Sequence, residues 1–197
     1  MPKKRKIAGV DEVGRGCLAG PVFSAAVILN KKIDKRNIKD SKQIPFKKRL
    51  FLSKYIKKNS LYSVGTSSVS EIDKINILNA SLLSMKRALH KLPVKPSIAY
   101  IDGPYVPKKM RIKCKSIVRG DEKNLNIAAA SIIAKVARDL FMIKLSKKYP
   151  GYAWERNFGY GTKKHLTGIK KYGINKHHRK KFRPVHNILM RKTRETL

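Results

Sequence analysis

The chain has 197 residues, of which 42% are hydrophobic and 30% are charged. This composition predicts one globular domain with a sizeable core and argues against a disordered or fibrous protein. No apolar run approaches the roughly 20 residues of a membrane span. The basic start leads into no signal-peptide pattern, and the two cysteines, Cys17 and Cys114, lie far apart. We therefore expect a cytoplasmic protein with no membrane contact, disulfide framework or zinc site.

The chain carries a large excess of positive charge. Lys and Arg number 47 against 12 Asp and Glu, which gives a formal net charge of +35. A polyanionic partner is indicated, and nucleic acid is the commonest one. One alternative stays open, because the 34 lysines also fit A/T-rich coding on a tolerant surface.

In chain order, the predicted elements alternate between strands and helices. They are strands at 7–13 and 22–29, a helix at 45–58, a strand at 61–69, a helix opened by Ser70, strands at 97–101 and 115–118, a helix at 124–147 and a short helix after Thr162. This alternation predicts an α/β fold with one sheet. We expect a single domain over residues 1–197, with a catalytic core over about 1–150 and a basic, mainly helical segment over about 151–197.

Three apolar runs end in a carboxylate beside glycine. They are IAGVDEVGRG, IAYIDGP and SIVRGDE. Strand ends next to glycine turns are where α/β proteins place functional groups, because the sheet fixes their position and glycine lets a ligand approach the backbone. Asp11, Glu12, Asp102 and Asp121 are therefore expected to converge at one edge of the sheet.

Four gathered carboxylates require a counter-charge, because their mutual repulsion raises their pKa values. Oxygen ligands favour Mg²⁺ or Mn²⁺ over zinc. On a basic protein, such a site indicates metal-assisted phosphodiester cleavage, with one ion activating water and a second stabilising the leaving oxygen.

Two of these assignments have a simpler alternative. Any single Asp beside Gly is commonly a turn residue, and Asp121 is also placed to cap a helix. Adjacent strand residues face opposite sides, so Asp11 and Glu12 both reach one ion only if the strand ends there or the Glu12 carbonyl contributes. Asp139 lies roughly 27 Å along a helix from Asp121 and is expected to pair with a nearby Lys or Arg.

The order of the motifs resembles the ribonuclease HII family of bacterial type. The similar segments are GVDEVGRG at 9–16, AGP at 19–21, DSK at 40–42, YIDG at 100–103, GDEKNLNIAAASIIAKVARD at 120–139 and GYGTKKH at 159–165. The resemblance covers roughly residues 7–186. Arg15, and the short stretch before Asp11, favour this family over ribonuclease HIII.

The resemblance implies a ribonuclease H-like fold, in which helices flank a five-stranded mixed sheet and a helical C-terminal segment follows. It implies an endonuclease that hydrolyses the RNA strand of RNA–DNA hybrids and incises 5′ to ribonucleotides embedded in duplex DNA, leaving 3′-hydroxyl and 5′-phosphate ends. Asp11, Glu12, Asp102 and Asp121 correspond to the family's ligands of Mg²⁺ or Mn²⁺. A monomer is expected.

The resemblance also implies substrate contacts outside the acidic group. Gly14, Arg15 and Gly16 correspond to an element that contacts the ribose 2′-hydroxyl, and Tyr160 to a tyrosine that packs on the neighbouring sugar. Lys42 and His165 correspond to polar positions near the substrate. Lys181 departs from the family, because it stands where a serine is usual.

Two rival functions stay open from the sequence. One is a basic nucleic-acid-binding protein without catalysis, which has no use for four carboxylates that repel phosphate. The other is a nuclease of the same fold that acts on a different substrate.

Overall fold

A computed structural model describes residues 6–30, 33–34, 38 and 44–195 of the chain. Its elements are β1 (Ile7–Val13), β2 (Val22–Leu29), α1 (Phe46–Lys58), β3 (Ser60–Ser67), α2 (Val69–His90), β4 (Ile98–Asp102), β5 (Lys113–Ile117), α3 (Gly120–Lys123), α4 (Leu125–Lys148), α5 (Trp154–Asn157), α6 (Lys163–Tyr172) and α7 (Arg183–Glu195). Within this described part, no helix is long and apolar enough to cross a membrane.

The five strands form one mixed sheet in the order β3-β2-β1-β4-β5. β1 and β2 are antiparallel, as are β2 and β3, whereas β1 pairs parallel with β4 and β4 with β5. This arrangement confirms the predicted α/β class and the mixed sheet. β1 lies at the centre, so a residue near its carboxyl end has a neighbouring strand on each side.

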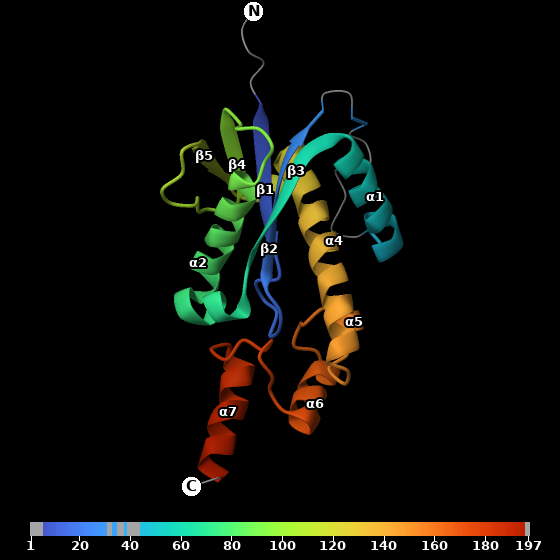
Figure 1. The fold of residues 1–197 in the computed structure, drawn as a ribbon, viewed down its shortest axis with the longest axis vertical. Helices are drawn as coiled ribbons and strands as arrows, with labels where there is room; N and C mark the ends of the chain where they lie inside the picture. Colours follow the sequence, from blue (N-terminus) through green and yellow to red (C-terminus); the bar gives the residue numbers. More distant parts are fainter. Residues whose placement is uncertain (1–5, 31–32, 35–37, 39–43, 196–197) are drawn as a thin grey trace, which may run out of the picture.

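Helices cover both faces of the sheet (Figure 1). α4 and α1 pack on one face through the small and branched residues of α4, including Ala129, Ile132 and Ile133, against Ala25 and Val27 of β2. α2 packs on the other face, where one cluster joins it to alternate residues of β1, β2 and β4. The apolar stripe expected on the long helix is thus the surface that lies against the sheet.

Local signals set the helix ends. α2 begins with a capping box, in which Ser68 Oγ accepts from the Glu71 amide at 3.2 Å and Glu71 Oε2 accepts from the Ser68 amide at 2.8 Å. The prediction that Ser70 opens this helix was wrong by two positions, because the Ser-x-x-Glu spacing starts at Ser68. The cap of α4 is Asn124, which accepts from the amides of the next turn, and not Asp121, which the sequence also placed to cap a helix.

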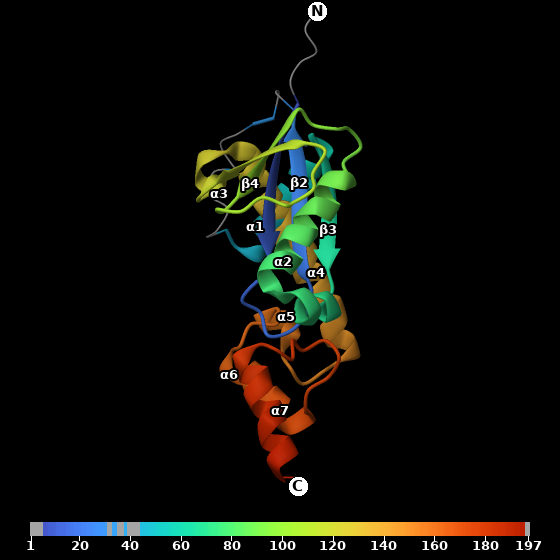
Figure 2. The same ribbon diagram turned by 90° about the vertical axis from the view of Figure 1, so that its left-hand side faces the viewer.

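The segment that follows α4, residues 151–195, lies beyond one end of the sheet (Figures 1 and 2). Its helices α5, α6 and α7 pack around Trp154, which is fully buried. The same cluster includes Leu18 and Ala19 from the loop between β1 and β2 and Met142 near the end of α4. The apolar contacts therefore join this segment to the first strand connection.

Candidate active site

Asp11 and Asp102 lie at the same level on two neighbouring parallel strands. The pairing of β1 with β4 runs up to Val10 opposite Ile101, and each aspartate is the next residue along its strand. Val10 and Ile101 pack into the cluster beneath α2. Because side chains alternate along a strand, both aspartates face the α4 side of the sheet. The Glu12 amide donates to Asp11 Oδ1 at 2.7 Å, and Ser131 of α4 acts to lower the pKa of this carboxyl.

Asp121 is joined to this pair through the backbone. Asp102 Oδ1 accepts a hydrogen bond of 2.6 Å from the amide of Gly120, the first residue of α3. Asp121 follows directly and is buried. The side-chain cap of the following helix comes from Asn124. Its position in the one-turn α3 therefore keeps Asp121 beside the end of β4.

Glu12 belongs to the same electrostatic group. β1 continues through Val13 beside β2, but its pairing with β4 stops at Val10, so the edge that faces Asp102 opens next to Glu12. Burial raises the pKa of Glu12, the Arg15 charge opposes this shift, and the Asp102 charge adds to it. Burial also raises the pKa of Asp11 well above its usual value, with further contributions from Glu12 and Asp102. These three carboxylates therefore repel one another as anions.

The carboxylate oxygens of this site are suitable ligands for a hard divalent cation. Glu12 Oε1 pairs with Arg15 Nη1 at 3.2 Å, whereas Glu12 Oε2 is buried and has no hydrogen-bond partner in the described structure. A buried carboxylate oxygen without a donor is unfavourable unless a cation or proton meets it. Among the described residues, no three Asp, Glu, His or Cys side chains form a complete group arranged to hold a metal ion. Carboxylate oxygens, including the Glu12 Oε2 atom that has no hydrogen-bond partner in the described structure, are nevertheless suitable ligands for Mg²⁺ or Mn²⁺.

The loop after β1 leads away from the carboxylates and exposes Arg15 and Gly16. Gly14 has a φ of +92°, a backbone conformation that side chains other than glycine rarely adopt. A Cβ atom on Gly14 would clash with Arg138 Nε and lie 2.7 Å from its Cδ. Within the described part of the chain, a Cβ atom on Gly16 would meet only Tyr160, at 3.9 Å from Cε1. Gly14 therefore packs inward, while Gly16 borders the surface next to Tyr160.

Two fully buried arginines hold this loop from inside. Arg138 of α4 donates to the carbonyl oxygens of Ala19, Pro21 and Phe158 at 2.8–3.0 Å. Arg179, which precedes α7, donates to carbonyl oxygens of Gly14, Arg15 and Gly20 at 2.6–3.0 Å. Burial lowers the pKa of Arg179 to about 10, so the guanidinium stays charged at neutral pH.

Tyr160 lies beside the loop and remains 41% exposed. The preceding Gly159 carbonyl accepts from the Leu18 amide at 2.8 Å, which joins the two segments. Burial raises the pKa of the Tyr160 hydroxyl, so it stays protonated at neutral pH. Tyr160 therefore presents a partly exposed ring next to Gly16, in a place suited to contact a sugar.

His165 does not fit the expected substrate contact, because its side chain is fully buried. His165 Nδ1 lies 2.9 Å from the Tyr160 carbonyl oxygen, and its Nε2 accepts from Trp154 Nε1 at 2.9 Å. A carbonyl only accepts, so Nδ1 carries the proton. His165 Nε2 also lies 3.2 Å from His178 Nε2. Burial lowers both histidine pKa values, that of His178 to about 4. The contacts make His165 a support for the Tyr160 backbone.

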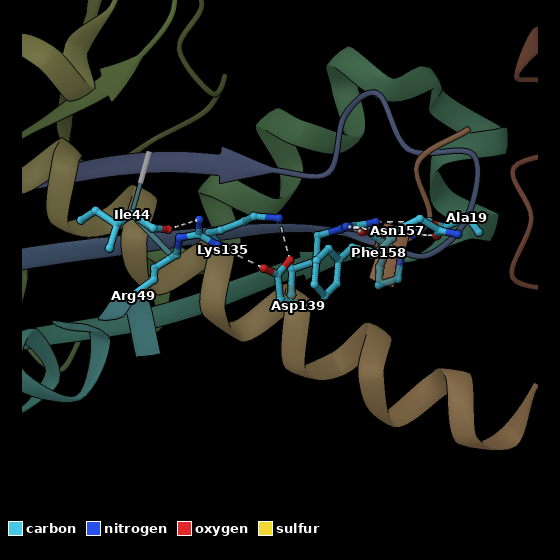
Figure 3. Close-up of polar contacts among 10 residues, drawn as sticks. Ala19, Ile44, Arg49, Lys135, Asp139, Asn157 and Phe158 are labelled. Atoms are coloured by element: carbon cyan, nitrogen blue, oxygen red, sulfur yellow. Dashed lines mark hydrogen bonds and ion pairs between the residues drawn. The ribbon is translucent and has the colours of Figure 1, made fainter. Parts of the chain in front are cut away.

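Asp139 takes the structural role expected of it. Its carboxylate lies 2.7 Å from Lys135 Nζ and 3.5 Å from Arg49 Nη1, and Figure 3 shows both cations directed at it. Arg49 also donates to the Ile44 carbonyl at 2.7 Å. This network joins α1 to α4. Lys42, the remaining expected substrate contact, lies outside the described residues.

Sequence reasoning missed Arg138 and Arg179. For Arg138 a signal existed, because it lies at four-residue spacing on the same line as Ala130, Ala134 and Met142, all of which are buried. Arg179 stands in a basic run without periodicity, where a surface position is the natural expectation. Only the folded structure shows that its partners are backbone carbonyls 159–165 positions earlier in the chain.

Comparisons with known proteins identify the family of this chain. Residues 8–186 match the family described as Ribonuclease HII. The Ribonuclease HII of Pelagibacter ubique is 56% identical over 183 residues, which cover 93% of this chain and 98% of that relative. The Ribonuclease HII of Roseobacter denitrificans is 46% identical over 185 residues, covering 94% and 93% respectively. The crystal structure of ribonuclease H2 from Pyrococcus horikoshii OT3 has a TM-score of 0.78 at 29% identity, covering 94% of this chain and 98% of that chain. The chain therefore belongs to the ribonuclease HII family and is a ribonuclease H-type endoribonuclease.

Proposed function

We propose that this enzyme hydrolyses the RNA strand of RNA–DNA hybrids and incises duplex DNA on the 5′ side of single embedded ribonucleotides, leaving 3′-hydroxyl and 5′-phosphate ends. Two divalent ions, Mg²⁺ or Mn²⁺, would be held by Asp11, Glu12, Asp102 and Asp121. The enzyme would act in the cytoplasm as a monomer.

The observation that carries this proposal is the buried acidic group at the ends of β1 and β4. Asp11 and Asp102 share one face of the sheet, and Glu12 has a buried oxygen without a hydrogen-bond donor. When bound, divalent ions supply a nucleophilic water and stabilise charge on the leaving oxygen. The Glu12 amide donates to Asp11 Oδ1 and the Gly120 amide donates to Asp102 Oδ1, so both carboxylates are oriented before a substrate arrives.

Substrate choice would come from the neighbouring loop. The exposed backbone at Arg15 and Gly16 is close enough to Tyr160 for one sugar to touch both. Only a 2′-hydroxyl distinguishes RNA from DNA at such a position, and glycine lets it approach the backbone. The net charge of +35 supports binding of a polyanionic duplex.

The test is cleavage of a labelled DNA duplex that contains one ribonucleotide, with Mg²⁺, with Mn²⁺ and with chelator. A long RNA–DNA hybrid and an all-DNA duplex are run beside it. We expect metal-dependent incision 5′ to the ribonucleotide, cleavage of the hybrid and no cleavage of DNA. Cutting of the hybrid alone would restrict the substrate to long RNA, and cutting of all-DNA would overturn the proposal.

Asp11→Asn is the critical variant, and Glu71→Gln is its matched control. Asp11→Asn keeps the side-chain volume but removes a metal-binding charge, so we expect cleavage to fall at least about a thousandfold while duplex binding persists. Glu71 lies in the capping box of α2 and pairs with Arg87, away from the acidic group, so its variant should cleave normally. Full activity of Asp11→Asn would contradict the metal assignment. Size-exclusion chromatography with light scattering tests the monomer.

A further inference from the structure

Arg179, like Arg138, is fully buried, which is unusual for a basic residue. All four side-chain hydrogen bonds that the described structure gives it end on carbonyl oxygens of one loop, those of Gly14, Arg15 and Gly20. Its guanidinium also stacks on Phe182, with Cζ 5.0 Å from the ring centre. The planar fork of a guanidinium suits several fixed acceptors at once, which the ammonium of lysine does not.

These bonds determine which way two peptide groups face. No peptide bond among the described residues is cis, and in a trans peptide the C=O and the following N–H point in opposite directions. Nη2 of Arg179 draws the Gly14 carbonyl inward at 2.6 Å, and Nη1 draws the Arg15 carbonyl inward at 2.8 Å. The N–H groups of Arg15 and Gly16 must therefore point away from the buried guanidinium, toward the exposed side of the loop.

Two successive N–H groups that face outward form a small site for an acceptor oxygen. Arg15 and Gly16 are both exposed, and no backbone acceptor in the described structure takes either amide proton. Tyr160 borders the same place. The loop thus offers two donors beside a sugar-sized ring, and the orientation of those donors depends on a side chain that the substrate never touches.

We infer that Arg179 is a positioning residue for ribonucleotide recognition, because its guanidinium turns the Arg15 and Gly16 N–H groups toward the 2′-hydroxyl oxygen of the bound strand. This inference rests on the proposed function, since it assigns a cause to the selection of a ribonucleotide. Arg138 supports the far side of the same loop, but its carbonyl partners, at Ala19, Pro21 and Phe158, do not include the two peptide groups that face the substrate.

The test compares binding of two duplexes in the Asp11→Asn background with Mg²⁺ present, so that the substrate stays intact. One duplex has a single ribonucleotide and the other is all DNA, and both are followed by fluorescence anisotropy. Arg179→Lys keeps the charge but loses the fork. We expect it to weaken binding of the ribonucleotide duplex about tenfold, with the all-DNA Kd changed less than twofold. Arg179→Met should abolish the preference, and Arg179→Lys carries the test if the methionine variant fails to fold.

Arg87→Lys is the matched control. Arg87 also bonds a backbone carbonyl, that of Thr66 at 2.8 Å, but it lies on α2 with Glu71 as its ion-pair partner. This variant should keep both affinities. If Arg179→Lys weakens both duplexes equally, or neither, the positioning role is overturned. If the Asp11→Asn parent itself does not bind the ribonucleotide duplex more tightly than the all-DNA duplex, the proposed substrate is wrong, and the inference that rests on it is wrong as well.

Discussion

Gly14 and Gly16 are two positions apart, yet a methyl group at each should have opposite effects. Gly14 has a positive φ and packs against the Arg138 side chain, whereas Gly16 has neither constraint. We therefore expect Gly14→Ala to destabilise the fold and Gly16→Ala to leave the fold intact but impair binding of a ribonucleotide.

The expected size follows from the contacts. A left-handed backbone costs about 1–2 kcal/mol for alanine. The added methyl would also push Arg138 away from its carbonyl partners, and losing one buried hydrogen bond to a charged group costs about 1.5–3 kcal/mol. Together these amount to about 2.5–5 kcal/mol, equivalent to a fall in Tm of about 5–20 °C for a chain of this size. The Gly16 methyl should change stability by less than about 0.5 kcal/mol.

Thermal melts followed by circular dichroism measure the first effect, and anisotropy with the ribonucleotide duplex measures the second. Gly16→Ala should bind that duplex about tenfold more weakly, because its methyl occupies the surface where glycine lets the sugar approach. Equal Tm values for the two variants would refute the assignment of Gly14 to the interior. An unchanged affinity of Gly16→Ala for the ribonucleotide duplex would show that the sugar does not bind at this surface.

Two further predictions concern buried carboxylates. The folded-state pKa values of Asp11 and Glu12 are raised, so their contribution to metal-free stability is present below about pH 4 and is lost as pH rises through those raised values. Chemical denaturation at a series of pH values should show that the free energy of unfolding declines as pH rises. Added Mg²⁺ should reverse this decline, and Asp11→Asn should reduce it. A difference in the free energy of unfolding between wild type and Asp11→Asn that does not change with pH would contradict the prediction. Asp139→Ala should lower stability by about 3 kcal/mol, because Lys135 and Arg49 lose their buried partner, while cleavage at 25 °C persists. Loss of cleavage in a folded Asp139→Ala protein would place this residue in the reaction.

The acidic group could be predicted from the sequence because the signals for it are local. An apolar run that ends in a carboxylate beside glycine is visible over seven to ten letters, and parallel pairing of β1 with β4 then places Asp11 beside Asp102. Element ends were less exact. β5 begins at Lys113, two residues before the expected Lys115, because pairing with β4, which alternation alone does not reveal, decides where the strand starts.

The support beneath the site was not predictable in the same way. His165 was assigned to the substrate because it follows Tyr160 in a shared motif, but a polar side chain five residues away can equally turn inward and bond the Tyr160 carbonyl. Arg179 has long-range partners, and no spacing rule connects it to Gly14. Its basic neighbours point to a solvent-exposed run, whereas the backbone carbonyls of the loop make burial favourable.

The contact between Arg179 and Gly14 spans 165 positions, which has a consequence for synthesis of the protein. At about 5–20 residues per second, a ribosome needs roughly 8–30 s after making Gly14 to reach Arg179. During that interval the acidic strand can already emerge, but the guanidinium that shapes the loop does not yet exist. On our inference for Arg179, a nascent chain does not select ribonucleotides until its last segment folds back onto the loop after β1.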